Sequence, residues 1–358
     1  MTKRSKALVL FAICLTAYCS VNLLSTFALN GDSWTTKTPM PTPRSGLRAA
    51  AVNGKIYAIG GFNMTTLGTN EEYDPATDKW ASKAPLPTLR LAFGIAVYQN
   101  KIYVMGGTID SNATGVNEVY DPLTDSWATK ASMPVARAYV DANTVNGKIY
   151  VIGGAYYPPI MGAFMTEYNE TQVYDPSTDS WTTKAAIPIP TGDYASAVID
   201  NKIYIVGAGG SPSSRIQIYD TITNTWATGK PLPFAERAAG VAATSGVNAP
   251  KRVYVIGGFS ATDELNQIYD PQTDNWTLGM NMTTPRYGLA LAVSNDVLYA
   301  VGGYGDGWLA SNEAYLPSSY SVPEFPSWLV LPSFIAVTLS VSIAYFERHK
   351  QVGVVKNP

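Results

Sequence analysis

A repeated pattern of apolar strand, glycine pair, tyrosine and tryptophan constrains the fold of this chain more than any other feature. Six apolar runs each end in a glycine pair or its remnant, as the run 56–59 ends in Gly60 and Gly61. In five copies a tyrosine stands seven residues before a tryptophan: Tyr73 and Trp80, Tyr120 and Trp127, Tyr174 and Trp181, Tyr219 and Trp226, Tyr269 and Trp276. A core of fixed length with loops of variable length is typical of stacked sheet units.

The sixth copy lacks a tryptophan strand of its own. Val322 stands seven residues after Tyr315, whereas Trp34 near the N-terminus has the flanking residues of such a strand but no unit to belong to. Placed beside the last unit, the segment around Trp34 would complete a four-stranded sheet and remove two open edges, which otherwise invite aggregation. The sequence therefore predicts an all-β, six-bladed propeller over residues 29–316, closed by its N-terminal strand.

The glycine pair, the Tyr-Asp-Pro of residues 73–75 and the tryptophan at constant spacing resemble kelch repeats. The resemblance extends from Gly31 to Pro317 and implies a propeller with four strands in each blade. Unit four departs from the pattern with Ala208 in its glycine pair, and unit six has Leu316 in place of the aspartate. We expect the repeated tryptophans and tyrosines to form the core rather than a binding surface, because burying each removes a large apolar area from water.

The N-terminal 28 residues have the features of a secretory signal. Lys3, Arg4 and Lys6 precede an apolar stretch, and cleavage is expected after Ala28. An uncleaved membrane anchor is the alternative interpretation. The two cysteines of the chain lie inside this segment, so the remaining domain is expected to contain neither a disulfide nor a thiolate site.

The C-terminal part contains a candidate membrane span. The 19 residues from Trp328 to Phe346 carry no charge, enough to cross a hydrocarbon core of about 30 Å. Basic residues follow the span, which predicts a cytoplasmic tail at 347–358, a transmembrane helix at 327–346, and a Pro- and Ser-rich tether at 317–326. The predicted location is therefore the plasma membrane, crossed once, with the propeller outside.

A short motif supports this membrane interpretation. The segment Val322-Pro323-Glu324-Phe325-Pro326 precedes the apolar span and resembles the Pro-Glu-Phe type of C-terminal sorting signal of archaeal surface proteins. The resemblance implies a sortase-like enzyme that cuts near the motif. Because this tail runs longer past its basic residues than the usual stub, we leave open whether the anchor is retained.

Charge and sequons fit an outward-facing domain. Without the six basic residues and one glutamate of the two ends, the 25 basic and 27 acidic residues of the chain become 19 and 26, a net charge of −7. This balance argues against a nucleic-acid partner. The candidate glycosylation sites are Asn63, Asn112, Asn169 and Asn281, whereas Asn275 adjoins a core tryptophan and is less favoured.

The residues available for chemistry are few. The one histidine, His349, falls in the predicted cytoplasmic tail, which excludes a Ser-His-Asp triad and an imidazole metal site in the propeller. The sequence predicts no catalytic residue, no cofactor and no metal. Carboxylates remain in connections that a propeller brings toward one face: Asp110, Glu167, Asp193, Asp263, Glu264 and Asp306. Solvated loop acids are the simpler interpretation of these six.

One set of arginines follows the repeat. An arginine stands thirteen residues before the strand tyrosine in four units, at Arg44, Arg90, Arg137 and Arg286. Arg237 fits the same position if residues 245–250 are an insertion, and unit four has Thr191 instead. Two interpretations remain open. The arginines form an anion-binding ring at one mouth of the central channel, or they brace the preceding loops by bonding backbone carbonyls.

The longest loop is the second candidate site. Residues 155–169 include Tyr156 and Tyr157 and exceed the corresponding loops of the other units by about eight residues. Exposed aromatic side chains on a rigid scaffold often mark a recognition surface. The alternative is a loop that folds back over the channel as a lid.

Two classes of function follow from these features. The first is a cell-surface binding or adhesion module, in which the arginines and the aromatic loop recognise a glycan, an envelope component or a protein. The second is an enzyme acting on an acidic sugar, similar to kelch-type sialic-acid mutarotases, with an arginine holding the substrate carboxylate and a loop acid moving a proton. The same fold serves both classes.

Overall fold

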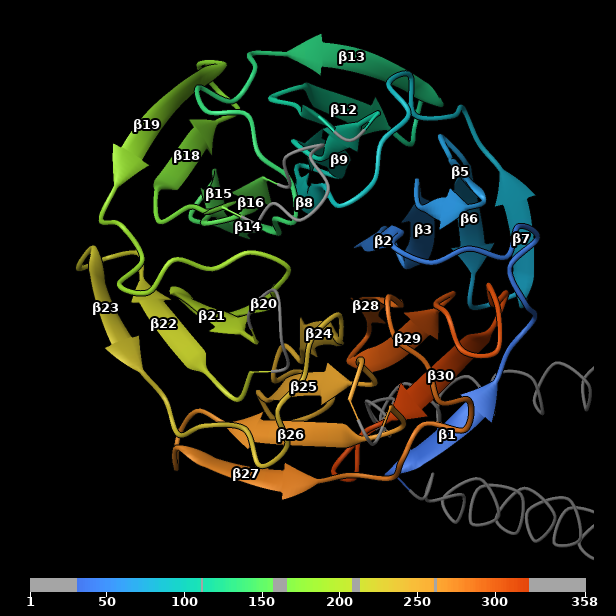
Figure 1. The fold of residues 1–358 in the computed structure, drawn as a ribbon. Coiled ribbons are helices and arrows are strands. Elements are labelled where there is room, and N and C mark those ends of the chain that lie inside the picture. The colour runs from blue at the N-terminus through green and yellow to red at the C-terminus, as the bar shows by residue number, and fades with distance from the viewer. Residues whose placement is uncertain (1–30, 111, 157–165, 208–212, 261–262, 322–358) are drawn as a thin grey trace, which may run out of the picture. The chain divides into compact units, whose positions relative to one another are not determined.

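Six four-stranded antiparallel sheets stand as blades around a central axis (Figure 1). The computed structural model describes residues 31–110, 112–156, 166–207, 213–260 and 263–321. Each blade runs outward from an inner strand beside the axis to an outer strand at the rim. The predicted all-β, six-bladed propeller is therefore confirmed for the described part of the chain.

The strands of each blade, from the axis to the rim, are as follows. Blade 1 contains β2 (Arg48–Val52), β3 (Lys55–Ile59), β6 (Asn70–Asp74) and β7 (Lys79–Ser82). Blade 2 contains β8 (Gly94–Tyr98), β9 (Lys101–Met105), β12 (Asn117–Asp121) and β13 (Ser126–Lys130). Blade 3 contains β14 (Ala142–Val145), β15 (Lys148–Ile152), β18 (Thr171–Asp175) and β19 (Ser180–Lys184).

Blades 4 to 6 repeat this order. Blade 4 contains β20 (Ala195–Ile199), β21 (Lys202–Val206), β22 (Ile216–Asp220) and β23 (Thr225–Thr228). Blade 5 contains β24 (Gly240–Ala243), β25 (Val253–Ile256), β26 (Asn266–Asp270) and β27 (Asn275–Leu278). Blade 6 contains β28 (Ala290–Ser294), β29 (Val297–Val301), β30 (Asn312–Leu316) and β1 (Ser33–Thr36). Short hairpins follow three glycine pairs: β4 (Phe62–Asn63) with β5 (Thr65–Thr66), β10 (Thr108–Ile109) with β11 (Asn112–Ala113), and β16 (Ala155–Tyr156) with β17 (Thr166–Glu167).

The apolar core lies between neighbouring blades rather than within one. Each core cluster takes its residues from two adjacent blades; Tyr73 of blade 1, for example, packs with Tyr299 of blade 6, with ring centroids 5.9 Å apart. The strands suit this packing because runs such as Ile56–Ile59 are β-branched or aromatic and buried on both faces. A blade therefore cannot bury its apolar faces without both neighbours.

A latch at the outer edge of each blade explains the seven-residue spacing. In blade 2, Trp127 lies directly opposite Tyr120 on the neighbouring strand, with ring centroids 5.1 Å apart. The Tyr120 hydroxyl donates to the carboxylate of Asp125, which also accepts the backbone N–H of Ala84. The Trp127 Nε1–H donates to the carbonyl of the same Ala84. The latch thus holds the segment that arrives from the preceding blade, and the repeated tryptophans belong to the framework, as expected.

The N-terminal strand closes the ring with the same latch. Strand β1 pairs with β30, and Trp34 lies opposite Tyr315. The Tyr315 hydroxyl donates to Asp32, while Asp32 accepts the backbone N–H of Met280 and Trp34 donates to the Met280 carbonyl. The predicted closure by the segment around Trp34 is therefore confirmed.

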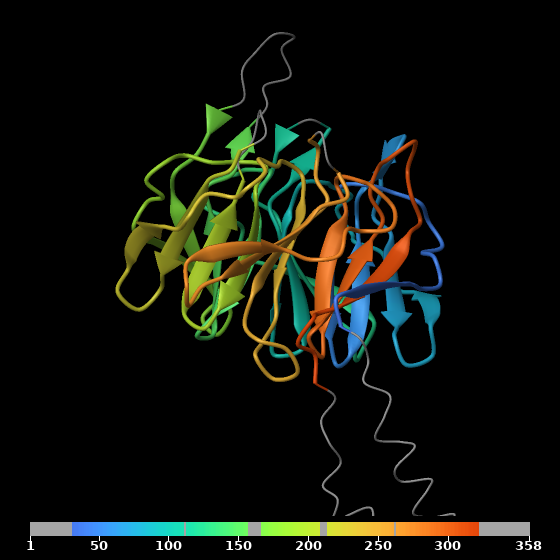
Figure 2. The same cartoon turned by 90° about the horizontal axis from the view of Figure 1, so that it is seen from below.

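The two faces of the propeller differ. The loops that follow the glycine pairs project on one face, and the chain enters at Gly31 and leaves after Pro317 on the opposite face (Figure 2). Within the described ranges, no helix is long and apolar enough to cross a membrane. The predicted signal at 1–28, the span at 327–346, the tail at 347–358 and residues 322–326 of the tether lie outside these ranges.

We predict that loss of the closing latch opens the ring. Replacing Trp34 with alanine should lower the free energy of unfolding by about 2 kcal/mol, since Trp34 is half-buried and full burial is worth roughly 3–5 kcal/mol. Thermal unfolding followed by circular dichroism measures the change. Thr36→Ala, on the exposed end of the same strand, is the control and should change stability little. An unchanged melting temperature for Trp34→Ala would show that the ring does not depend on this strand.

Candidate functional site

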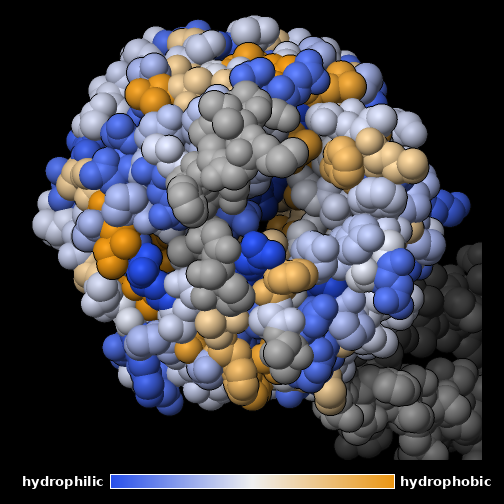
Figure 3. All heavy atoms as spheres, viewed as in Figure 1, coloured by the Kyte–Doolittle hydropathy of each residue, from blue (hydrophilic) through white to orange (hydrophobic). Residues whose placement is uncertain are grey.

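Six residues with left-handed backbone form a ring around the mouth of the channel on the glycine-pair face. Four neighbouring pairs are linked by backbone hydrogen bonds: Tyr139 donates to Ala92, Asp193 to Tyr139, Gly288 to Ala238 and Gly46 to Gly288. The ring consists of Gly46, Ala92, Tyr139, Asp193, Ala238 and Gly288. Each follows the repeated arginine position by two residues, so the side chains around this mouth are set by the repeat. Figure 3 shows this face with a hollow at its centre.

The four repeated arginines lie beneath this mouth and are fully buried. Arg44 has no exposed surface, and its guanidinium donates to the carbonyls of Thr42, Ala58 and Gly60. It also forms an ion pair of 2.6 Å with Glu71. Arg90 repeats these bonds with Glu118, and Arg286 also forms an ion pair with a buried carboxylate, that of Glu313.

The expectation that these arginines present an anion-binding ring is corrected by their burial. Arg44, Arg90, Arg137 and Arg286 expose no side-chain surface to a ligand. The sequence register places them correctly near one mouth, but their side chains turn inward to the carbonyls of the glycine-pair strands. The alternative interpretation, that they brace the loops, describes the observed contacts.

Backbone hydrogen bonds at the arginine position show which residue replaces the arginine in blades 4 and 5. The backbone carbonyl of this residue accepts the N–H of a glycine in the preceding blade, as Thr191 accepts from Gly154. In blade 5 this position is Glu236. The next residue, Arg237, forms a backbone hydrogen bond with Phe259, just as Ser45, the residue after Arg44, forms backbone hydrogen bonds with Phe62. The assignment of Arg237 to the arginine set is therefore wrong by one residue, because the loops around blade 5 differ in length.

The carboxylate partner changes together with the arginine. Blades 1, 2 and 6 pair arginine with Glu71, Glu118 and Glu313, whereas blades 4 and 5 have Gln217 and Gln267 there. Gln217 bonds both the N–H and the carbonyl of Ile189, and Gln267 bonds those of Phe234. An unpaired carboxylate at this depth would be costly, and the neutral amide removes that cost.

Blade 3 is the intermediate case. Arg137 faces Gln172 at this position and lies 3.6 Å from Glu170 instead, while its Nε and Nη2 atoms are buried without hydrogen-bond partners. The guanidinium lies over the ring of Tyr168, with 5.7 Å to the ring centroid. This blade therefore keeps the arginine but loses most of its bonding.

A double-mutant cycle tests the compensation. Arg90→Thr should lower the free energy of unfolding by roughly 3–5 kcal/mol, because it leaves Glu118 buried and unpaired. The pair Arg90→Thr with Glu118→Gln copies blade 4 and should recover about 1–3 kcal/mol of that loss. Denaturant unfolding of wild type, both single variants and the double variant gives the coupling energy. Additive losses would contradict the compensation.

Glu236 is the unusual member of the arginine set. It is 1% exposed, one carboxyl oxygen accepts from the Ser260 hydroxyl at 3.0 Å, and the other has no hydrogen-bond partner in the described residues. Burial, together with the negative charges of Asp263 and Glu264, raises the pKa of Glu236 to about 7, although the Ser260 bond opposes the shift. This carboxyl group can therefore gain or lose a proton near neutral pH.

The raised pKa predicts a pH-dependent stability. The unfolded chain ionises Glu236 near pH 4.5, whereas the folded chain retains the proton until about pH 7, so stability falls as pH rises between these values. Glu236→Gln lacks this fall, so its free energy of unfolding should exceed that of the wild type by about 3 kcal/mol above pH 7. Denaturant unfolding at pH 5 and pH 8 measures it, with Asp110→Asn, an exposed acid of another blade, as the control. If the difference in free energy of unfolding between Glu236→Gln and the wild type is equal at both pH values, the titration of buried Glu236 is contradicted.

An arc of aromatic side chains crosses the same face over blades 1, 6 and 5. Neighbouring ring centroids lie 5.0–6.0 Å apart along the series Phe62, Trp308, Tyr304, Tyr287 and Phe259. The guanidinium of Arg237 lies over the last ring, 4.4 Å from its centroid. Phe62 and Phe259 are 36% and 44% exposed, and the other three rings are half-buried. We call this series, with Arg237, the aromatic arc.

Backbone pairing above each blade positions the arc. Phe62, Phe259 and Tyr304 each follow the second glycine of a pair, and Arg237 and Tyr287 each follow the arginine position. The two positions pair with each other above the same blade, as Tyr287 with Tyr304 in blade 6, and Tyr304 also pairs with Trp308. Our sequence reasoning missed these five aromatic residues. The signal was present: besides the closing Trp34, Trp308 is the one tryptophan of residues 29–316 that falls outside the seven-residue spacing.

The remaining candidates lie around this mouth. Burial raises the pKa of Asp193, and the charges of Arg48 and Arg237 offset only part of that rise. Glu167 accepts the N–H of Gly192, whereas Asp110 and Asp306 are exposed. Tyr156 is half-buried in β16, and Tyr157 lies outside the described residues, as does most of its loop. The structure therefore brings Arg237, Asp193 and the aromatic arc to one face but does not test the long loop.

The sequon asparagines are mostly accessible. Asn112, Asn169 and Asn281 are exposed, as is the less favoured Asn275. Asn63 is half-buried in β4, and its side-chain amide donates to the carbonyl of Pro43 at 2.7 Å. Glycosylation at Asn63, Asn112, Asn169 and Asn281 stays a prediction.

Comparison with family models agrees with this geometry. The KLHDC2/KLHL20/DRC7 Kelch-repeats domain matches residues 92–303, and the Kelch motif matches residues 43–87. The chain belongs to the kelch-repeat family. The kelch resemblance of the sequence is thus confirmed, and the glycine pairs, the buried arginines and the latches describe how this kelch propeller is held together.

Other comparisons bear on the fold alone. No curated protein matches the chain, whereas 806 chains of solved structures do. One of them, described as "Structure of YjhT", has 17% sequence identity and a TM-score of 0.65 over 78% of this chain and 95% of its own. Within the part of the kelch propeller that the structure describes, no group of three or more His, Cys, Asp or Glu side chains is placed to hold a metal ion.

Proposed function

We propose that this kelch propeller is a cell-surface binding module and that its aromatic arc binds a glycan. The observation that carries the proposal is the continuous row of rings from Phe62 to Phe259, ending under the guanidinium of Arg237. The rings are held by backbone pairing and packed against one another at tilted or edge-on angles, so they lose little conformational entropy when a ligand binds. A binding module is also a use to which kelch propellers are suited.

Sugar chemistry fits such an arc. The axial C–H bonds of a pyranose present partly positive hydrogens, which the negative face of an aromatic ring attracts. The sugar hydroxyls need polar partners beside the rings, and Arg237, Asp193 and Asp306 lie on the same face. Arg237 would also favour an acidic sugar, since a guanidinium recognises a carboxylate with two parallel hydrogen bonds.

The positions of the chain ends support display at a surface. The described propeller segment begins and ends on the face opposite the loops that follow the glycine pairs, and the aromatic arc belongs to those loops (Figure 2). A transmembrane helix at 327–346 would hold the propeller outside the plasma membrane. The signal at 1–28, the tail at 347–358 and glycans on the sequons complete this proposal.

Replacement of arc residues tests the binding function. Trp308→Ala and Phe259→Ala should each weaken glycan binding about 10-fold or more, because losing a central aromatic contact costs at least about 1.4 kcal/mol. A glycan array probed with the purified protein would identify ligands, and isothermal titration calorimetry would measure their affinities. Leu123→Ala is the control, since Leu123 is 93% exposed in a turn remote from the arc.

Two outcomes would contradict the glycan proposal. One is an array with no bound glycan while the protein captures a peptide or protein through the same residues, which would assign the arc to protein recognition. The other is unchanged glycan binding in both arc variants. Trp308→Phe should keep most of the affinity, because it retains an aromatic ring.

Glu236 favours a second candidate function, an enzyme acting on an acidic sugar. Its pKa of about 7 suits a group that both accepts and donates a proton at neutral pH, and Arg237 beside it would hold the sugar carboxylate. Nuclear magnetic resonance of anomer exchange in acidic sugars tests this candidate. Exchange that is accelerated by the wild type and not by Glu236→Gln would favour the enzyme, and no acceleration would exclude it for the sugars tried.

A further inference from the structure

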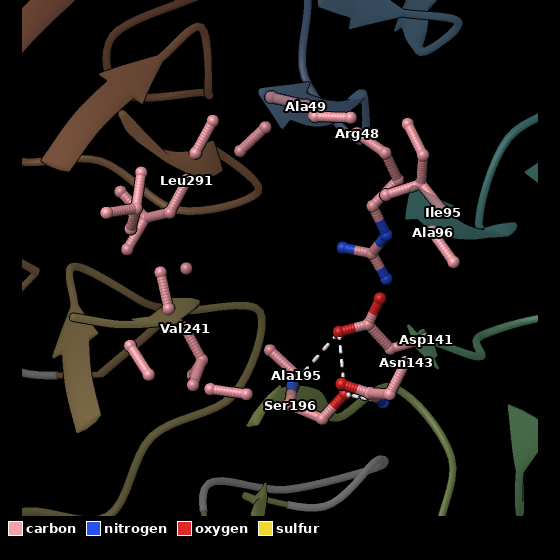
Figure 4. A pocket seen from close by; sticks show the side chains of 18 of the residues that line it. Arg48, Ala49, Ile95, Ala96, Asp141, Asn143, Ala195, Ser196, Val241 and Leu291 are labelled. Atoms are coloured by element: carbon pink, nitrogen blue, oxygen red, sulfur yellow. Dashed lines mark hydrogen bonds between the residues drawn. The ribbon is translucent and has the colours of Figure 1, made fainter. Parts of the chain in front are cut away.

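The central channel holds a second feature, which is independent of the aromatic arc. Its cavity of about 410 Å³ has a polar side and an apolar side (Figure 4). Blades 5 and 6 contribute only alanine, glycine, valine and leucine, with Val241 and Leu291 as the larger side chains. Blades 1, 3 and 4 contribute Arg48, Asp141 and Ser196. A ligand in the channel would therefore contact charge on one side and apolar surface on the other.

Arg48 is held in place without using its whole guanidinium. Its Nε donates to the carbonyl of Phe93 at 3.1 Å, and its Nη2 donates to that of Val140 at 3.2 Å. Nη1 has no hydrogen-bond partner among the described residues. The side chain thus crosses from blade 1 toward blade 3 and leaves the two N–H donors of Nη1 for a ligand in the channel.

Asp141 is held in a similar way from the opposite direction. One carboxylate oxygen accepts from both the N–H and the hydroxyl of Ser196, at 3.0 and 2.8 Å, and the other accepts from the N–H of Ala142. Asn143 donates to the same hydroxyl at 2.7 Å and fixes its orientation. The carboxylate keeps acceptor capacity, because each oxygen carries two lone pairs.

The two charged groups extend toward each other on one side of the channel but do not form an ion pair. Figure 4 shows the Arg48 guanidinium and the Asp141 carboxylate extending toward one another. Neither side chain forms an ion pair within the described ranges. Fixed, unpaired charges in a narrow, mostly apolar channel attract ligand groups of opposite sign strongly, because the low dielectric of the walls focuses the field.

We propose that the channel binds a small zwitterion, namely an α-amino acid with an aliphatic side chain. The ligand carboxylate would accept from Arg48, the ammonium group would donate to Asp141, and the side chain would lie against Val241 and Leu291. A simple anion is repelled by Asp141 and a simple cation by Arg48, so a molecule with both charges is favoured. The cavity has the size of a small-molecule site.

Calorimetric titration of the full-length chain with L-leucine tests the proposal. Two analogues each lack one charge: 4-methylpentanoate has no ammonium group, and 3-methylbutylamine has no carboxylate. We expect leucine to bind and each analogue to bind at least 10-fold more weakly. No binding of leucine at millimolar concentration, or equal binding of leucine and either analogue, would overturn the proposal.

Three variants of the two channel charges separate recognition from folding. Asp141→Asn keeps an acceptor for Ser196 and should lower leucine affinity at least 10-fold without changing the melting temperature much. Arg48→Lys keeps the charge but loses the bonds to the two carbonyls, so affinity should fall less than in Arg48→Gln. Arg252→Gln, an arginine outside the cavity, is the control and should bind as wild type. Wild-type affinity in both Asp141→Asn and Arg48→Gln would show that these charges serve only to join the blades.

Discussion

The latch between tyrosine, aspartate or asparagine, and tryptophan is the interaction on which the rest of this structure depends. It joins the outer edge of each blade to the segment arriving from the preceding blade through one side-chain acceptor and one side-chain donor. In blade 4 the acceptor is Asn224, and in blade 6 it is Asp32 from the far end of the chain. Because the last latch closes the ring, every blade is fixed relative to every other blade.

Buried charge shapes the next layer inward. In blades 1, 2 and 6 the buried arginine pairs with a glutamate, blade 3 keeps the arginine beside a glutamine, and blades 4 and 5, which lack the arginine, carry a glutamine at the glutamate position. This exchange follows from the high cost of a lone charge in the interior. Glu236 departs from the rule, since it is a buried carboxyl group without a cationic partner in hydrogen-bond contact. Departures of this kind concentrate where function outweighs stability.

The blades then differ in what they present to solvent. Blades 1, 5 and 6 carry the aromatic arc, and the channel has charged groups from blades 1 and 3 opposite the apolar walls of blades 5 and 6. A regular framework with irregular loops and inner strands can thus hold two binding sites of different chemistry, because the positions that vary lie outside the latches and the interblade core.

The sequence by itself determined the strands, the number of blades and the closure at Trp34, because glycine pairs and the seven-residue spacing are local patterns with local causes. It also located the arginine position, but not that Arg44 turns inward to Glu71, since side-chain direction depends on carbonyls and carboxylates brought near by folding. Only the tertiary structure showed that Glu236, and not Arg237, occupies the arginine position of blade 5, because the loops around this blade differ in length. Only the closed ring brought Phe62 next to Trp308, and Arg48 opposite Asp141, because these residues are distant along the chain and meet only where blades converge on one axis.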